Sequence, residues 1–179
     1  MRIITGKYGG RKIYPPAKMP YTRPTTDVAK EGLFNILENN ISITGLKTLD
    51  IFGGTGSITY ELASRGAHDL TIVEKDPKMY SFIQKSVLNL EIENCKVVKM
   101  DVFRFVENCV EKYDLIFAGP PYALQNIDDL PKLIIDKNLL AKNGWFILEH
   151  TPANNYEKSP MFKSMRNYGT TIFSIFINN

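Results

Sequence analysis

The segment Leu49-Asp50-Ile51-Phe52-Gly53-Gly54-Thr55-Gly56-Ser57 leads out of an apolar strand and into a helix. Its glycines allow the backbone to pass close to a ligand, because no side chain stands in the way. In open α/β sheets, ligands bind at the carboxyl ends of the strands, which is where this loop lies. We therefore expect this loop to hold a cofactor.

The loop does not match the dinucleotide fingerprint Gly-x-Gly-x-x-Gly, because the third glycine, counted from Gly54 and Gly56, falls on Thr59. A cofactor with a pyrophosphate group is therefore disfavoured, and so is a nicotinamide oxidoreductase. Asp50, just before the glycines, argues against an anionic ligand and for a cationic one, such as a sulfonium with an α-amino group.

Two more acidic residues follow the next two predicted strands. Glu74 follows the strand expected at 70–73, where a carboxylate can accept both hydroxyls of a ribose. Asp101 follows the strand expected at 96–100, where it can accept a hydrogen bond from an adenine edge. Each acid alone could equally be a loop or helix cap. Three acids at three successive strand ends, with a glycine-rich turn after the first, indicate a cofactor site.

Strand-like and helix-like segments alternate from residue 48 onward, which predicts an α/β protein with a mostly parallel, twisted sheet flanked by helices. The helix after Asp76 has Pro77 at its first position, a favourable start. The expected strands are 48–52, 70–73, 96–100, 115–117, 145–150 and 170–177, and the other expected helices are 57–65, 102–109 and 128–135.

A short extension precedes this pattern. We expect a β-hairpin from strands at 2–5 and 11–14, a proline-rich loop, and a helix that ends near Asn39. A boundary near 42–47 would divide the chain into an N-terminal unit (1–42) and a cofactor-binding domain (43–179).

The positive charge of the chain is concentrated in its first thirty residues, which hold seven basic groups and one acidic group, with Tyr8, Tyr14 and Tyr21 between them. Basic side chains release counterions from phosphates, and aromatic rings stack on unpaired bases. A solvated basic arm would have the same composition. Charge alone therefore leaves both nucleic-acid contact and a merely solvated arm open.

Several protein classes are disfavoured by composition. No apolar run approaches the ~20 residues that a membrane span requires, and the N-terminus does not have the pattern of a signal peptide. Cys95 and Cys109 do not form a CxxC pair, and His68 and His150 are too scattered for a zinc signature. We expect a cytoplasmic protein with reduced cysteines, no metal site and no membrane contact.

Residues 50–67 resemble motif I of the Rossmann-like class I S-adenosylmethionine-dependent methyltransferases. Nearly the whole chain resembles the bacterial 16S ribosomal RNA (guanine-N2)-methyltransferase family, called RsmD-like. Residues 2–12 resemble its opening hairpin, 23–27 and 33–35 resemble the loop and helix that close over its cofactor, and 168–171 resemble its C-terminal turn.

The resemblance implies S-adenosylmethionine as the cofactor. Asp50 and the glycine turn would hold its methionine part, Glu74 its ribose, and Asp101 and Val102 its adenine. The implied cofactor-binding residues are Asp50, Phe52, Gly53, Gly54, Gly56, Glu74, Lys75, Asp101, Val102, Arg23 and Thr25, the last two covering the site, and the implied RNA-binding residues are Lys7, Arg11, Lys12 and Arg23.

Residues 114–122 end in Gly119-Pro120-Pro121-Tyr122 and resemble the (Asp/Asn)-Pro-Pro-(Tyr/Phe) loop of the family, which makes these four the predicted catalytic residues. An exocyclic amine is a poor nucleophile because its lone pair is delocalised into the ring. An acceptor on the amine hydrogens helps that lone pair to point at the methyl group. Two prolines stiffen the loop, and an aromatic ring gives the target base a stacking face. Holding the amine and methyl group in line is a positioning effect.

Gly119 departs from the family pattern, because glycine has no side-chain acceptor where the family has Asp or Asn. Three interpretations follow: a slower enzyme, an enzyme in which another carboxylate supplies the acceptor, or a protein that binds without catalysis. If the loop is only impaired, Gly119→Asp should raise the rate at least tenfold. Glu149 and His150 end the next strand, at the same rim, and are candidates for the substitute, although both could be merely structural.

The sequence therefore predicts a methyltransferase that acts on the exocyclic N2 amine of a guanine in 16S ribosomal RNA, working as a monomer on the RNA or the assembling small subunit. One alternative is a catalytically impaired protein that binds S-adenosylmethionine and RNA. Another is a methyltransferase acting on protein, or on an adenine amine of DNA or RNA. A DNA adenine enzyme would normally need a target-recognition segment, for which 179 residues leave no room.

Overall fold

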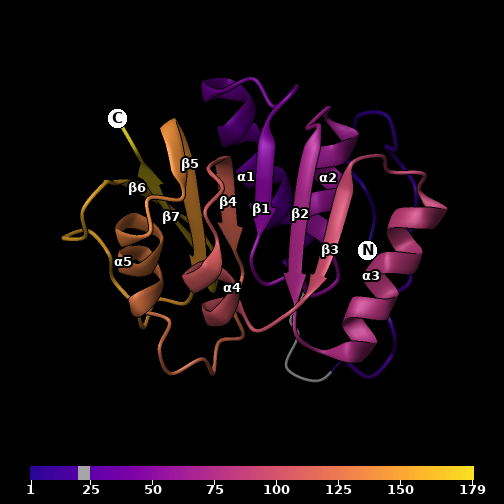
Figure 1. Ribbon diagram of the computed structural model, residues 1–179. Helices are drawn as coiled ribbons and strands as arrows, with labels where there is room; N and C mark the ends of the chain where they lie inside the picture. The colour runs from indigo at the N-terminus through magenta and orange to yellow at the C-terminus, as the bar shows by residue number, and fades with distance from the viewer. Residues whose placement is uncertain (20–24) are drawn as a thin grey trace.

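The computed structural model describes residues 1–19 and 25–179, and within them seven strands form one sheet in the order β3-β2-β1-β4-β5-β7-β6 (Figure 1). Strands β1 to β5 pair in parallel, and β7 pairs antiparallel with β5 and β6. The predicted α/β class is therefore confirmed. The strands are β1 Lys47–Asp50, β2 Asp69–Glu74, β3 Cys95–Lys99, β4 Tyr113–Ala118, β5 Leu140–His150, β6 Phe162–Tyr168 and β7 Thr171–Ile177.

Five helices are described, and two of them begin at the acidic residues that the sequence singled out. Asp76 caps α3 by accepting a hydrogen bond from the Met79 amide, with Pro77 at the first position as predicted. Asp101 caps α4 by accepting from the Phe103 and Arg104 amides. The helices are α1 Asp27–Asn40, α2 Ser57–Ser64, α3 Pro77–Asn89, α4 Val102–Asn108 and α5 Asp129–Asp136.

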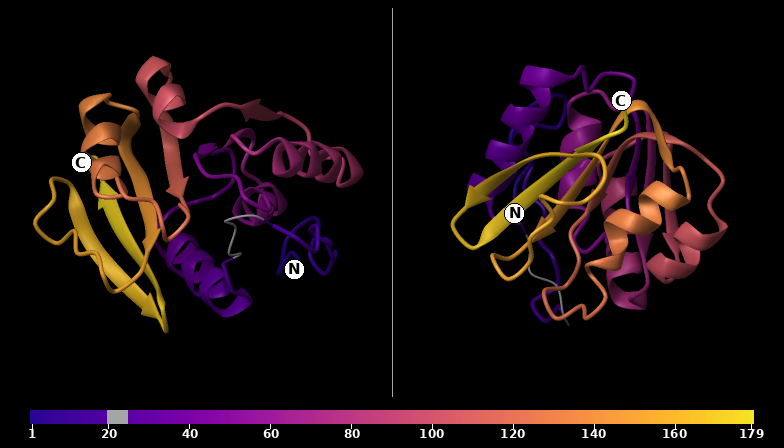
Figure 2. Two further views of the ribbon diagram at one scale, coloured as in Figure 1. Left: turned by 90° about the horizontal axis from the view of Figure 1, so that it is seen from below. Right: turned by 90° about the vertical axis from the view of Figure 1, so that its left-hand side faces the viewer.

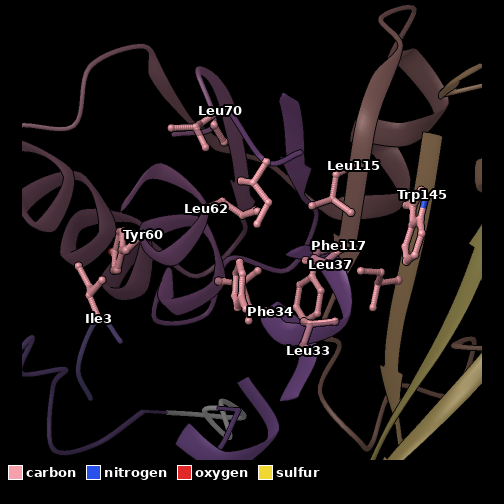
Figure 3. Close-up of a cluster of buried hydrophobic side chains, with 14 of the residues drawn as sticks. Ile3, Leu33, Phe34, Leu37, Tyr60, Leu62, Leu70, Leu115, Phe117 and Trp145 are labelled. Carbon is pink, nitrogen blue, oxygen red and sulfur yellow. The ribbon is translucent and has the colours of Figure 1, made fainter. Parts of the chain in front are cut away.

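Each face of the sheet has its own hydrophobic core, because successive side chains of a strand point to opposite faces. On one face, Phe34 of α1 and Leu62 of α2 belong to the same cluster as Leu115 and Phe117 of β4 (Figure 3). On the other face, α4 and α5 pack against the sheet. Figure 2, in the view from below, shows α1 on the opposite side of the sheet from α4 and α5.

Strand β6 was not predicted. It lies at the sheet edge and pairs only with β7 among the described strands, and most of its side chains are exposed. Its sequence, Phe-Lys-Ser-Met-Arg-Asn-Tyr, does not have the continuous apolar character of a buried strand. The turn to β7 contains Gly169, whose φ of +69° favours glycine.

The expected N-terminal hairpin is present but shorter than predicted: its two arms pair through one antiparallel bridge, between Arg2 and Lys12, and backbone hydrogen bonds such as that from Ile3 to Arg11, and they do not form two full strands. The reason lies in α2. The Glu61 carboxylate accepts hydrogen bonds from the amides of Ile4 (2.8 Å) and Thr5 (3.2 Å), so these amides have a side-chain partner in place of a strand partner.

Three charged side chains form a buried ion cluster, defined as Lys30, Glu61 and Arg65, which the sequence analysis did not anticipate. The Lys30 ammonium lies 3.5 Å from Glu61 and donates to the Arg2 carbonyl (2.6 Å), and Arg65 donates to Glu61 at 2.8 Å. Burial lowers the pKa of Lys30, against the opposing effect of the Glu61 charge. The cluster joins the N-terminal segment, α1 and α2.

The N-terminal segment also shares the apolar core, since Ile3 and Tyr8 belong to the cluster that contains Leu33 and Leu115. Because the two parts share a core, the predicted boundary near residue 42 concerns function, namely which part of the chain contacts RNA, and it stays a proposal. Among the described residues, no helix has the length and apolar character to cross a membrane.

Candidate active site

A pocket of about 640 Å³ opens at the carboxyl ends of the parallel strands. Its volume is in the range of small-molecule and cofactor sites. The predicted residues that line it are Thr25, Asp50, Phe52, Gly53, Gly54, Glu74, Lys75, Asp101, Val102, Gly119, Pro120, Pro121 and Tyr122.

Gly56 does not line the pocket, and its role is to set the conformation of the glycine loop. Its φ of +79° is in the left-handed region, and a Cβ atom there would lie only 2.3 Å from the Tyr60 ring. Its amide donates to the Gly53 carbonyl (2.7 Å), which closes the turn before α2. Arg23 lies outside the described residues, so the structure does not place it.

Glu74 holds the glycine loop. One carboxylate oxygen accepts from the Gly54 amide and the other from the Asp76 amide, both at 2.8 Å. A carboxylate oxygen has two lone-pair sites, so each oxygen can accept one more hydrogen bond from a ligand hydroxyl. Glu74 thus combines a structural role with the capacity expected for a ribose contact.

Asp50 is almost completely buried, with 2% of its surface exposed. It accepts hydrogen bonds from the Phe52 amide (3.3 Å) and the Thr59 hydroxyl (3.2 Å). Burial, together with the smaller effect of the Glu74 and Glu149 charges and against the two hydrogen bonds, raises the pKa of Asp50 to about 8. A cationic ligand in the pocket would favour the ionised form of this carboxyl, because opposite charges attract strongly at low dielectric.

The side chains next to Asp101 in the pocket lining are apolar. Val102 is buried, and Phe103 and Leu124 are partly buried members of the second core cluster. This composition suits a flat aromatic group between hydrophobic side chains. The pocket residues that sequence reasoning missed are Ile51, Thr55, Ser57, Ile58, Val73, Asp76, Pro77, Phe103, Phe117, Ala123 and Leu124. Several of them are next to predicted residues in the sequence, whereas Phe117 and Leu124 could be assigned to the pocket only from the three-dimensional structure.

Gly119 follows β4, and the nearest carboxylate in the pocket belongs to Glu149 at the end of β5. A Cβ atom built on Gly119 would lie 3.6 Å from Glu149 Oε2 and 3.0 Å from Phe117 Cε1. Glu149 is 4% exposed and lines the pocket. Its Oε2 accepts from the Thr25 hydroxyl (2.6 Å), and its Oε1 accepts from the Tyr122 hydroxyl (3.3 Å).

The expectation that His150 faces the same rim is wrong. Neighbouring residues on a strand point to opposite faces, so Glu149 and His150 diverge. His150 donates through Nδ1 to the Thr151 carbonyl, its Nε2 is 2.8 Å from the Ser174 hydroxyl, and its ring packs edge-on against Tyr156. Burial lowers the pKa of His150. This histidine is a structural residue of the second core.

The predicted RNA-binding side chains Lys7, Arg11 and Lys12 are exposed and lie outside the pocket. The cationic groups of Lys7 and Arg11 lie over the buried Tyr8 ring, 5.1 and 5.4 Å from its centre. The two cationic groups therefore lie on a turn that is fixed to the core by the buried Tyr8 side chain. Farther along, Lys78 of α3 donates to the Lys18 carbonyl (3.0 Å), which ties residue 18 to the helix whose first residue, Pro77, lines the pocket.

Within residues 1–19 and 25–179, no group of three or more His, Cys, Asp or Glu side chains could hold a metal ion. Cys95 and Cys109 are half-buried free thiols, and burial raises the pKa of Cys95 to about 12.

The chain is similar to known proteins in both sequence and fold. The family model described as conserved hypothetical protein 95 matches residues 1–177. Ribosomal RNA small subunit methyltransferase D of Buchnera aphidicola subsp. Baizongia pistaciae is 31% identical over 164 residues, covering 87% of this chain and 83% of that protein. The solved structure of the Escherichia coli yhhF protein has a TM-score of 0.86 at 26% identity, covering 99% of this chain and 97% of that one.

A more distant likeness bears on the fold alone. The Thermus thermophilus 16S rRNA N2 G1207 methyltransferase RsmC, in complex with AdoMet and guanosine, has a TM-score of 0.70 at 20% identity, over 87% of this chain and 44% of that one. The strand order, the position of the pocket and these likenesses all indicate the same fold. The chain belongs to the conserved hypothetical protein 95 family, which includes ribosomal RNA small subunit methyltransferase D, and has the fold of the class I methyltransferases.

Proposed function

We propose that this protein is an S-adenosylmethionine-dependent methyltransferase that methylates the exocyclic N2 amine of a guanine in 16S ribosomal RNA. One observation carries the proposal: the acid-lined cofactor pocket at Asp50 and Glu74 opens onto the Pro120-Pro121-Tyr122 loop. The family membership supports the same function, because relatives named for methylation of small-subunit ribosomal RNA match most of the chain.

The residues of the pocket fit S-adenosylmethionine. Asp50 and the backbone around Gly53 and Gly54 would hold the cationic methionine part, Glu74 the ribose, and Val102 with Phe103 the adenine. The cluster of carboxylates suits a ligand with a sulfonium and an ammonium group. When bound, this group supplies an electrophilic methyl.

The chain's own residues position the base. Pro120 and Pro121 restrict the backbone of the loop, and Tyr122 offers a ring for stacking. A target base must leave its stack to reach such a pocket. Holding amine and methyl in line lowers the entropic part of the barrier. The exposed cations of Lys7 and Arg11 would hold phosphates beside the site.

The proposal also assigns parts of the chain. Residues 1–42 would contact RNA and cover the cofactor, through Thr25, which lines the pocket, and Arg23, two positions earlier in the sequence. The substrate would be the naked RNA or the assembling small subunit, and the protein would act as a monomer in the cytoplasm. Because α1 contributes the buried Leu33 and Phe34 to the core, removing residues 1–42 would disturb folding. Point variants such as Thr25→Ala are therefore a better test of whether this segment covers the cofactor.

The decisive experiment measures transfer of labelled methyl from S-adenosylmethionine to under-methylated small ribosomal subunits, with calorimetric titration of the cofactor in parallel. Incorporation at guanine N2 is expected. Glu74→Gln should weaken cofactor binding at least about tenfold, as expected for a hydrogen bond to a charged group, while the exposed Glu157→Gln serves as the matched control. Absence of cofactor binding in the parent protein would overturn the proposal.

A second candidate function is a protein that binds cofactor and RNA without catalysis. It is favoured by one observation, the lack of a side-chain acceptor at Gly119. Tight cofactor binding and RNA binding without methyl incorporation would establish it.

A further inference from the structure

The pocket holds a carboxylate at the place where the catalytic loop lacks one. Gly119 has no side chain, yet Glu149 Oε2 lies 3.6 Å from the point where its Cβ would be. An acidic side chain from β5 thus approaches the volume that an aspartate at 119 would enter from β4. The two strands are adjacent and parallel, with Ala118 paired to Leu148, so the next residues along the chain, Gly119 and Glu149, lie side by side.

The Glu149 side chain is held in one orientation. Thr25, just before α1, donates to Oε2, and Tyr122 of the loop donates to Oε1. A buried carboxylate with fixed partners is preorganised, which is the condition under which an acceptor contributes most to a transition state.

The chemistry of the two oxygens matches one base edge. Guanine presents two donors side by side, N1–H and the N2 amine, whereas adenine presents the N6 amine beside N1, an acceptor. A carboxylate only accepts, so it pairs with both guanine donors and with only one adenine group. A loop with Asn could pair with the adenine edge through its own amide, and this chain has neither Asn nor Asp at 119.

We propose that Glu149 is the catalytic residue that recognises the guanine edge and accepts the amine proton, in place of the side chain missing at Gly119; this rests on the proposed function. The N2 lone pair forms the bond to the methyl carbon as the carbon–sulfur bond breaks and its electron pair goes to sulfur. The nitrogen, now positively charged, gives one of its two protons to the Glu149 carboxylate, which releases it to water.

The test pairs Glu149→Gln with Glu149→Gln/Gly119→Asp, which moves the carboxylate from β5 to the loop. Methyl transfer to under-methylated subunits should fall about 100-fold in Glu149→Gln, the loss typical of one preorganised group. The double variant should transfer methyl groups at least about tenfold faster than Glu149→Gln. Glu157→Gln, the same change at an exposed position outside the pocket, should retain the parental rate.

A binding readout separates recognition from a structural role. With S-adenosylhomocysteine present, guanosine monophosphate should bind the parent protein about tenfold more tightly than adenosine monophosphate, the discrimination of a bidentate base contact. Inosine monophosphate, which lacks the N2 amine, should fall between them. In Glu149→Gln the guanosine preference should drop below threefold. Equal weakening of all three nucleotides, without rescue by Gly119→Asp, would show that Glu149 has a structural role and does not recognise the base.

Gly119→Asp alone tests the proposal if Glu149→Gln folds poorly. It would place a second carboxylate against Glu149 and the edge of Phe117, so the rate should fall at least tenfold. A tenfold rise, as expected of a loop that lacks its only acceptor, would overturn the proposal. A parent protein that shows the guanosine preference but transfers no methyl would contradict the proposed function and leave the recognition by Glu149 supported.

Discussion

Removing the charge at the centre of the buried ion cluster should destabilise the protein strongly. Glu61 is 0% exposed, with Lys30 at 1% and Arg65 at 5%. Glu61→Gln keeps the shape but leaves two buried cations without the carboxylate between them. Breaking a buried pair costs about 3–5 kcal/mol. Arg65 retains Glu38 as a partner at 2.8 Å, so we expect the lower end of this range, about 3 kcal/mol.

The assay is urea and thermal unfolding of the parent and Glu61→Gln, with Glu38→Gln as the matched control. For a chain of this length a loss of 3 kcal/mol lowers Tm by about 6–12 °C. Glu38 pairs with the same arginine but is 46% exposed, so its loss should cost less than about 1 kcal/mol. The Ile4 and Thr5 amides, bonded to Glu61, should lose protection from hydrogen exchange first. Equal losses in the two variants, both below about 1 kcal/mol, would refute the reasoning.

Three further predictions concern the cofactor loop and the basic turn. Because the pKa of Asp50 is raised, the folded protein keeps a proton that the unfolded chain releases above about pH 4. The free energy of unfolding should therefore decrease between about pH 4 and 8, by up to about 1.4 kcal/mol per pH unit. Asp50→Asn should flatten this pH dependence in urea titrations. Gly53→Ala should cost about 1–3 kcal/mol and weaken cofactor binding, because the new Cβ would lie 2.5 Å from Ile72 Cγ2; an unchanged unfolding midpoint would contradict this. Neutralising Arg11 and Lys12 together should lower the slope of log K against log salt by about 1–2 in RNA binding measurements, and an unaltered slope would show that the basic turn is not the contact.

Much of the fold was predictable because the signals are local. The alternation of strands and helices, the Asp76-Pro77 helix start and the glycine loop each depend on residues close together in the chain, and the predicted elements agree with the structure within a few residues except at the start of β5. Edge strand β6 was missed because an exposed edge needs no apolar pattern. The hairpin strands were predicted too long because Glu61, far along the chain, accepts hydrogen bonds from the Ile4 and Thr5 amides.

The candidate site divides in the same way. The sequence by itself determined which residues follow the parallel strands, and the topology of such a sheet brings those residues to one edge. Only the tertiary structure decided which neighbours face the pocket: Glu149 points to it and His150 to the opposite core, because the pleat alternates and the sheet has helices on both faces. The approach of Glu149 to Gly119 and the pairing of Lys30 with Glu61 likewise join residues distant in the chain, because three-dimensional packing and burial, not sequence spacing, set their separation.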